Sequence, residues 1–377
     1  MMKRLFHAPR LWASDPHNPR RVTWMELFFD LIFVAAVAQV GEPLVEDYTP
    51  AGLFRYAFLF VLIWWAWSGH TAYVTRFDQD DLPNRLLVLL QCFIAAVMAA
   101  NAKDALDSRS SAGFGAAYAG MRIVLVAQYL RARRVSETRA LTTRYAAGFG
   151  IAAVLWLASA LLDAPARYWL WAFALAMDFA TPWLAAAHTR RFPPDASHYP
   201  ERFGLFTIIL LGEFIAAVMR GIESQEEWSL PAASTAFAAM AFAFVLRWWY
   251  FDVAGGAERR HVRFDLWQYA HLPMFLGIAV AGVGFERTIA QGGGETWMLC
   301  AGCAVLTAAI AAIGGTSGAS RKQVAGQLWI SIAMAALAGA AGHLPGVAVV
   351  LLLLGMACGQ TLLGAPPAAT AARRLAA

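Results

Sequence analysis

The sequence has little charge for its length. Only 15% of the 377 residues are Asp, Glu, Lys or Arg, whereas 59% are hydrophobic. A soluble domain carries roughly 25% charged residues, so this chain lacks the charge needed to cover a water-facing surface. The net charge of +5 comes from basic residues in short loops between apolar runs. That placement indicates membrane orientation and argues against nucleic-acid binding.

Cysteine is also scarce, and the familiar enzyme motifs are missing. All four cysteines fall in apolar segments, where a free thiol behaves as a small buried hydrophobe: Cys92, Cys300, Cys303 and Cys358. Cys300 and Cys303 form a CxxC pair, but no second pair or flanking His completes a metal site. Hydrolase, zinc-protease, P-loop and dinucleotide fingerprints do not occur. We therefore expect no cofactor and no bound metal.

Long apolar runs dominate what is present. A spanning helix needs about 20 mostly apolar residues, and the linkers between such runs are short and rich in Gly, Pro, Asp and Arg. The candidate spans are 24–44, 53–74, 83–101, 112–130, 145–163, 167–188, 203–220, 231–251, 267–285, 296–315, 323–342 and 346–364. The sequence predicts an all-α polytopic membrane bundle with about twelve transmembrane helices.

The basic residues predict how the chain is oriented. If the N-terminus is cytoplasmic, every basic cluster falls in a loop on the cytoplasmic side, as the positive-inside rule requires. The most basic of these loops lies between the fourth and fifth spans and holds five arginines within 131–144. We expect a bacterial inner-membrane protein with both termini in the cytoplasm. Its expected partners are the lipid bilayer and a small molecule or ion.

The two groups of six spans resemble each other weakly. The first span opens with ELFFDLIFV from Glu26, and the seventh opens with ERFGLFTII from Glu201. Because six is even, the halves would have the same orientation, an arrangement found among secondary transporters. Chance recurrence of acids and aromatics at the membrane interface is the alternative. The predicted parts are a basic segment 1–22, a first half 23–188, a second half 189–365 and a cytoplasmic tail 366–377.

Ionisable residues inside the apolar runs are the candidate functional residues, because a charge in a bilayer costs roughly 3 kcal/mol unless it is paired or hydrated. Glu26 and Asp30 lie four residues apart and share one face of the first span. Their mutual repulsion favours uptake of a proton, and the pair could equally hold a cation. The alternative is a simple salt bridge from Glu26 to Arg20 or Arg21.

Two further acids lie deeper in the predicted membrane. Glu213 is halfway along the seventh span, and Asp178 is halfway along the sixth, four residues before Pro182. A proline removes the hydrogen bond to the carbonyl four residues back, which here belongs to Asp178. An acid and a bare carbonyl at this depth could bind a proton or a small cation. Hydrogen bonding to Ser, Thr or Tyr of a neighbouring helix is the alternative.

Three other sites have weaker signals. His271 lies next to a proline in the ninth span and could relay protons, although an ordinary interfacial His is equally compatible. Arg122 and Arg247 lie within spans, so we expect each to pair with one of the acids. The loop from Arg76 to Asp81, RFDQDD, resembles a cation-ligand cluster in composition. It lacks the spacing and the glycine of a calcium loop, which favours a solvated turn.

Several blocks of the sequence are distinctive in composition and spacing. The first block is Thr23–Val34 (TWMELFFDLIFV), and the second runs from His198 (HYPERFGLFTII) through Glu213. The remaining blocks are Trp64-Trp65 with Tyr73, Arg76, Phe77, Asp78, Asp80 and Asp81; Trp248-Trp249 with Tyr250, Phe251 and Asp252; and Tyr269, His271 and Pro273. Together they resemble the bacterial low-temperature-requirement A family of membrane proteins, and the resemblance extends from about residue 20 to 360. It implies multi-pass membrane proteins named for a cold-growth phenotype, without a settled activity or family active site. Asp178 belongs to none of these blocks.

On the predicted topology, the block residues gather at cytoplasmic helix ends of both halves. They predict a charged vestibule leading to Glu213, lined by Arg76, Asp78, Asp80, Asp81, His198, Glu201, Arg202, Asp252 and Tyr269. We therefore expect a secondary transporter coupled to protons or a small cation, with Glu213 as the coupling acid and Asp30 and Glu26 as gate or relay. One alternative is a membrane-embedded enzyme acting on a lipid or isoprenoid headgroup, with His198 or His271 in acid–base or metal-binding roles. A sensor or scaffold is the other.

Overall fold

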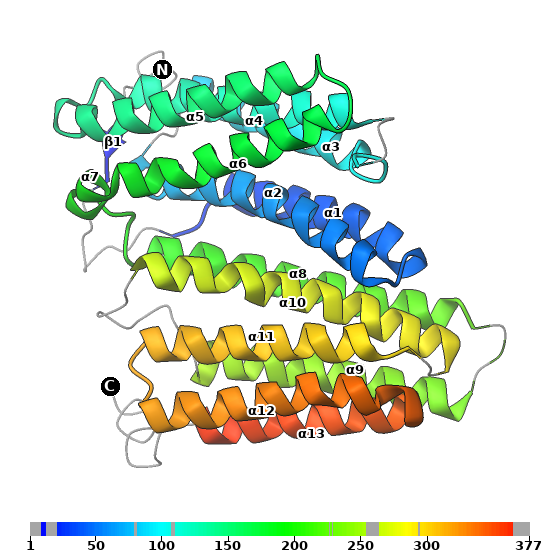
Figure 1. Ribbon diagram of the computed structural model, residues 1–377. Coiled ribbons are helices and arrows are strands. Elements are labelled where there is room, and N and C mark those ends of the chain that lie inside the picture. The colour runs from blue at the N-terminus through cyan, green and yellow to red at the C-terminus, as the bar shows by residue number, and fades with distance from the viewer. Residues whose placement is uncertain are drawn as a thin grey trace. The chain divides into compact units, whose positions relative to one another are not determined.

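The computed structural model describes residues 9–12, 21–78, 81–106, 110–225, 227, 229–253, 264–292 and 295–364. These residues are almost entirely helical (Figure 1). The chain divides into two compact units, which are described separately below. Unit 1 comprises Met1–Pro43 and Ala51–Arg202, and unit 2 comprises Leu44–Pro50 and Phe203–Ala377.

Unit 1 is built mainly from the first seven helices. They are α1 (Trp24–Glu46), α2 (Pro50–Val74), α3 (Leu82–Ala100), α4 (Ser111–Ala132), α5 (Arg139–Ser159), α6 (Ala166–Leu184) and the short α7 (Ala186–Arg191). Two short strands, β1 (Arg10–Leu11) and β2 (Phe77–Asp78), pair antiparallel at the end of α2. Aromatic side chains of α2, α4 and α5 form a buried cluster that includes Tyr73, Tyr129, Tyr145 and Phe149.

Unit 2 holds the remaining helices. They are α8 (His198–Glu223), whose first turn belongs to unit 1, α9 (Leu230–Trp248), α10 (Phe264–Gln291), α11 (Trp297–Thr316), α12 (Arg321–Ala340) and α13 (Gly346–Gly364). A π-helical turn (Trp249–Val253) follows α9.

Glycines allow α10 and α11 to approach closely. A Cβ added to Gly277 would lie 2.7 Å from the backbone nitrogen of Leu306, and one added to Gly284 would lie 2.7 Å from the Cα of Leu299. Small residues at a helix–helix contact bring backbones together, which is how membrane helices gain van der Waals contact in the absence of a hydrophobic driving force.

The lengths of the helices suit a bilayer. Twelve of the thirteen described α-helices have 19 to 28 residues. At about 1.5 Å per residue, the shortest of them is about 28 Å long, close to the hydrocarbon thickness of about 30 Å. Within the described residues, ten helical segments are both long and apolar enough to cross a membrane; α4 and α6 are not among them. The predicted all-α, multi-pass membrane bundle is confirmed, whereas the count of twelve spans and the six-plus-six repeat remain predictions.

Polar side chains fix where several helices begin. Asp81 caps α3 by accepting a hydrogen bond from the backbone N–H of Asn84, and Ser229 caps α9 in the same way through Ala232. In both helices a proline occupies the first turn, where its missing N–H costs nothing.

Helix α8 begins at His198, five residues before the apolar span predicted from residue 203. His198, Glu201 and Arg202 are therefore helical and share the geometry of one first turn.

Candidate functional site

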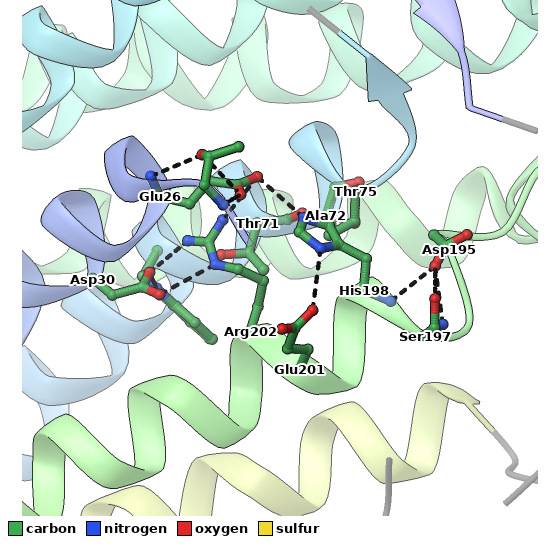
Figure 2. Close-up of polar contacts among 12 residues, drawn as sticks. Glu26, Asp30, Thr71, Ala72, Thr75, Asp195, Ser197, His198, Glu201 and Arg202 are labelled. Carbon is green, nitrogen blue, oxygen red and sulfur yellow. Dashed lines mark hydrogen bonds and ion pairs between the residues drawn. The ribbon is translucent and has the colours of Figure 1, made fainter. Parts of the chain in front are cut away.

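The first turn of α1 meets the first turn of α8 within unit 1, and charged side chains gather there (Figure 2). Glu26 forms a capping box with Thr23: its Oε2 accepts hydrogen bonds from the Thr23 backbone N–H (2.8 Å) and hydroxyl (3.0 Å), and its own N–H donates to the Thr23 hydroxyl (3.3 Å). The second carboxylate oxygen, Oε1, faces α8. It lies 3.1 Å from Nε2 of His198 and 3.5 Å from Nη1 of Arg202.

Asp30 and Arg202 form a fully buried ion pair one turn further into the helices. The guanidinium donates from Nε to Oδ2 (3.1 Å) and from Nη2 to Oδ1 (2.5 Å) of the carboxylate. The indole N–H of Trp67 on α2 donates to Oδ1 as well, at 2.7 Å. Two parallel charge-assisted hydrogen bonds of this kind hold both planes in a fixed orientation. Helices α1, α2 and α8 are therefore joined at one carboxylate.

A cap from the preceding loop positions His198. The carboxylate of Asp195 accepts hydrogen bonds from the backbone N–H groups of Ser197 (2.9 Å) and His198 (2.8 Å), which fixes the start of α8. The His198 side chain is fully buried between two acids. Its Nε2 contacts Glu26, and its Nδ1 lies 3.7 Å from Oε2 of Glu201, one turn along the same helix.

The cluster combines groups of fixed charge with groups whose charge can change. The carboxylates of Glu26 and Asp30 are buried, and the Arg202 guanidinium faces both of them. Arginine keeps its proton, whereas a carboxylate and an imidazole can each exchange one. Glu26 and His198 are therefore the members of the cluster through which a proton could act.

A second buried ion pair lies deeper in unit 1. Nε of Arg122 on α4 lies 3.0 Å from Oδ2 of Asp178 on α6, and the Tyr118 hydroxyl donates to the same oxygen at 3.2 Å. The Arg122 guanidinium also donates to Tyr118 and lies over the Tyr118 and Phe149 rings. Arg122 is thus paired with one of the predicted acids, and the pair is electrically neutral.

The other predicted residues of unit 1 lie outside both clusters. Arg76 is buried and donates to the backbone carbonyls of Ala72 (3.0 Å) and Phe192 (3.1 Å). Asp81, besides capping α3, lies 2.7 Å from Nη2 of Arg131. The exposed Asp78 belongs to β2, opposite Arg10 of β1. Asp80 lies outside the described residues, as does Arg20, one of the two simple partners predicted for Glu26.

In unit 2, His271 is buried and has a hydrogen bond at each ring nitrogen. Nδ1 lies 2.7 Å from the carbonyl oxygen of Trp267, so it must be the protonated nitrogen, and Nε2 lies 2.8 Å from the Tyr250 hydroxyl and accepts from it. Phe203 and Phe275 pack against the ring. This arrangement satisfies a neutral imidazole. Tyr269 lies in the same first turns of α10 and is partly exposed.

Glu213 is partly exposed and belongs to a charged triad of unit 2. Its Oε1 lies 3.1 Å from Nη1 of Arg220, and Nη2 of the same arginine lies 3.1 Å from Oε2 of Glu286 on α10. The side chains are 22% (Glu213), 44% (Arg220) and 14% (Glu286) exposed. Arg247 pairs with Asp252 at 3.1 Å, and both are about half exposed. Arg247 therefore contacts an acid at the helix end and not one of the deeper acids.

The comparisons with known proteins agree with the sequence blocks. Residues 21–364 match the family model described as "Bacterial low temperature requirement A protein (LtrA)". The chain belongs to the bacterial low temperature requirement A family. It is also 29% identical, over 294 residues, to a protein of Rhizobium meliloti (strain 1021) that is described as uncharacterized; the match covers 72% of this chain and 70% of that protein.

The contact between α1 and α8 constrains the topology of this LtrA protein. Both helices begin in the cluster, so their starts lie on the same side of the membrane. The chain between them must then cross the membrane an even number of times. The six predicted spans satisfy this condition, and so do the four apolar spans α1, α2, α3 and α5.

The structure adds three residues to the site of the LtrA protein that the sequence did not single out. Trp67 donates to Asp30, Asp195 caps α8, and the buried His70 stacks on Phe29 with ring centroids 4.1 Å apart. Asp195 had a readable signal, because an aspartate three residues before a helical His and five before Pro200 is typical of a capped helix start. Trp67 and His70 had no such signal, since an aromatic residue in an apolar run looks like ordinary packing.

In the described part of the chain, no group of three or more His, Cys, Asp and Glu side chains is arranged to hold a metal ion.

Proposed function

We propose that this LtrA protein is a secondary transporter of the bacterial inner membrane that couples substrate movement to a proton, with both termini in the cytoplasm. The observation that carries the proposal is the α1–α8 cluster: at the start of two apolar helices it buries the carboxylates of Glu26 and Asp30 against Arg202 and His198, and Glu26 and His198 are groups that can exchange a proton. A charged group within a membrane span is costly and is a functional-site hypothesis by default.

The geometry divides the cluster into a fixed and a variable part. Asp30 holds Arg202 by two hydrogen bonds and accepts a third from Trp67, so this pair acts as an anchor. Glu26 holds Arg202 only at 3.5 Å and contacts His198 through a single oxygen. Protonation of Glu26 would remove its attraction for Arg202 and weaken the contact between the starts of α1 and α8. A proton can thereby shift the population between two arrangements of these helices.

This assignment moves the coupling role from Glu213 to Glu26. Glu213 is partly exposed and paired with Arg220, so it has access to the surroundings and a partner when ionised. We propose a place for Glu213 on the substrate route, with less influence on proton binding.

Burial favours transport over the alternative of a headgroup-modifying enzyme. The enzyme requires acids and a His that a lipid headgroup can reach, whereas Asp30, His198 and Arg202 have no exposed surface. The scaffold alternative treats the same contacts as clamps between helices. The scaffold alternative predicts that neutralising Glu26 changes the stability of the protein and leaves proton movement unchanged.

Reconstituted vesicles test the proposal. Proteoliposomes containing a pH-sensitive dye would be exposed to small cations, amines and carboxylates, and to a small-molecule extract of bacterial cells. We expect substrate-dependent proton movement with wild type, and its loss with Glu26→Gln although the variant is folded and inserted.

The matched control is Glu223→Gln, which neutralises an exposed acid at the end of α8 and should move protons as wild type does. Equal proton movement in Glu26→Gln and Glu223→Gln, or no proton movement by wild type with any addition, would contradict the proposal.

A further inference from the structure

The imidazole of His198 lies between two carboxylates of very different exposure. Nδ1 faces Oε2 of Glu201, whose side chain is 43% exposed, and Nε2 faces Oε1 of Glu26, whose side chain is 8% exposed (Figure 2). The His198 side chain itself has no exposed surface. One ring nitrogen is thus directed towards the surroundings and the other towards the buried cluster.

The two contacts of the ring are unequal. Nε2 is within hydrogen-bond distance of Glu26 at 3.1 Å, whereas Nδ1 is 3.7 Å from Glu201 and has no hydrogen-bond partner although it is buried. Buried polar atoms are nearly always hydrogen-bonded, so an open one calls for an explanation. The backbone of His198 is fixed by Asp195, while Glu201 is one helical turn away on a flexible, half-exposed side chain. Movement of Glu201 by about 1 Å would complete the hydrogen bond.

We propose that His198 relays a proton from Glu201 to Glu26, and that this is the route by which the buried cluster is loaded. The inference rests on the proposed function and names its proton pathway. Glu201 takes a proton from water and passes it to Nδ1 of His198. The proton on Nε2 then moves to Oε1 of Glu26, which leaves the ring protonated at Nδ1. The ring returns to its first tautomer by the reverse path, in which Glu26 gives its proton back to Nε2 while Nδ1 gives its proton to Glu201. No other reactant is needed, since one proton leaves water and one carboxylate is neutralised.

The neighbours of Glu26 support this assignment. Its Oε2 accepts the two hydrogen bonds from Thr23, and its Oε1 faces His198 and Arg202. Arginine does not give up a proton in proteins, whereas an imidazole has two nitrogens, one for entry and one for exit of a proton. Of these two side chains, His198 is therefore the one that can pass a proton to Oε1.

Time-resolved infrared spectroscopy after a pH jump, on the purified full-length protein in lipid nanodiscs, tests the relay. The carboxyl band of Glu26 is identified by its loss in Glu26→Gln, and its rate and final amplitude are measured. We expect Glu201→Gln to slow protonation of Glu26 by about ten-fold or more while the final amplitude stays the same. His198→Gln keeps a hydrogen bond to Glu26 but cannot relay, so it should slow the band at least as much. Glu223→Gln, which neutralises an exposed acid at the end of α8, should behave as wild type.

Chemical rescue separates a relay from a purely structural contact. Added formate should restore the rate in Glu201→Gln, because a small acid can deliver the proton to Nδ1. A wild-type rate in Glu201→Gln, or a slow rate that formate does not change, would overturn the relay. Glu201 is half exposed and has no role in the core, so this variant carries the test even if His198→Gln does not fold.

The infrared measurement follows proton binding and not transport, so the two proposals fail separately. A Glu201-dependent band without coupled flux in vesicles would refute the transporter and keep the relay. Coupled flux with a band that is independent of Glu201 and His198 would refute the relay and keep the transporter. Absence of a Glu26 carboxyl band at every pH would refute the relay as well.

Discussion

Unit 1 and unit 2 are both built from long helices, yet they treat charge in opposite ways. Unit 1 buries two ion pairs, Asp30–Arg202 and Arg122–Asp178, each with less than 2% of its side-chain surface exposed. Among the described side chains of unit 2, no Asp, Glu, Lys or Arg is buried, and the buried polar groups are His, Thr, Ser and Gln. The helices of unit 2 make close backbone contact at glycines, and side-chain amides donate across helices to backbone carbonyls, as Gln327 and Gln360 do to each other.

Charge can be rearranged in unit 1, whereas unit 2 is held mainly by close packing. A buried ion pair has alternative states, since a proton or a shift of one partner changes its energy by several kcal/mol. A contact between glycines and backbone atoms has a single favourable arrangement, because dense packing tolerates little change. We therefore place the moving part of the proposed transporter in unit 1.

The largest expected effect is the loss of the buried arginine of unit 1. Arg202→Leu leaves the buried carboxylate of Asp30 without the arginine that pairs with it, which should cost about 3–5 kcal/mol of stability. The matched variant in unit 2 is Arg220→Leu, whose arginine is 44% exposed and serves two partly exposed acids. Thermal unfolding in detergent and the yield in membranes measure both. Equal destabilisation by the two variants would remove the contrast between the units.

An intermediate effect is expected at the close helix contact of unit 2. Gly277→Ala places a methyl group 2.6 Å from Cβ of Leu306, so α10 and α11 must separate at a cost of about 1–3 kcal/mol. Gly355→Ala on α13 is the control, because its added Cβ has no neighbour within 4 Å. Unfolding temperatures of the two variants give the comparison. A neutral Gly277→Ala would show that unit 2 is loosely packed at this contact.

The smallest expected effect concerns Glu213. Glu213→Gln breaks a partly exposed ion pair, which typically contributes no more than about 1 kcal/mol, and Arg220 keeps Glu286 as a partner. Stability should be almost unchanged, and proton movement in vesicles should fall less than in Glu26→Gln. A loss as complete as that of Glu26→Gln would make the triad of unit 2 the coupling site and reverse the comparison.

Much of the fold followed from the sequence, because apolar length and helix caps are local properties. The family blocks, the helical composition and the costly acids Glu26, Asp30 and Asp178 were all visible there. The pairing of these acids was not, since Glu26 and Asp30 meet their partners 172 residues further along the chain. Helix periodicity gives the face on which a side chain lies but not the helix that covers it. The start of α8 was missed because hydropathy was followed there, whereas the polar cap Asp195 determines it.

The capping box at the start of α1 has a consequence for local order. One carboxylate, Glu26, both accepts a hydrogen bond from the backbone N–H of Thr23 and faces Nε2 of His198. When that carboxylate is protonated it becomes a weaker acceptor, so the first turn of α1 should fray more often. The amide hydrogen exchange rates of a few residues at the start of α1 should then depend on whether Glu26 is protonated. Slow exchange at Thr23 would mark the empty site and fast exchange the loaded one, giving a readout of coupling that needs no knowledge of the cargo.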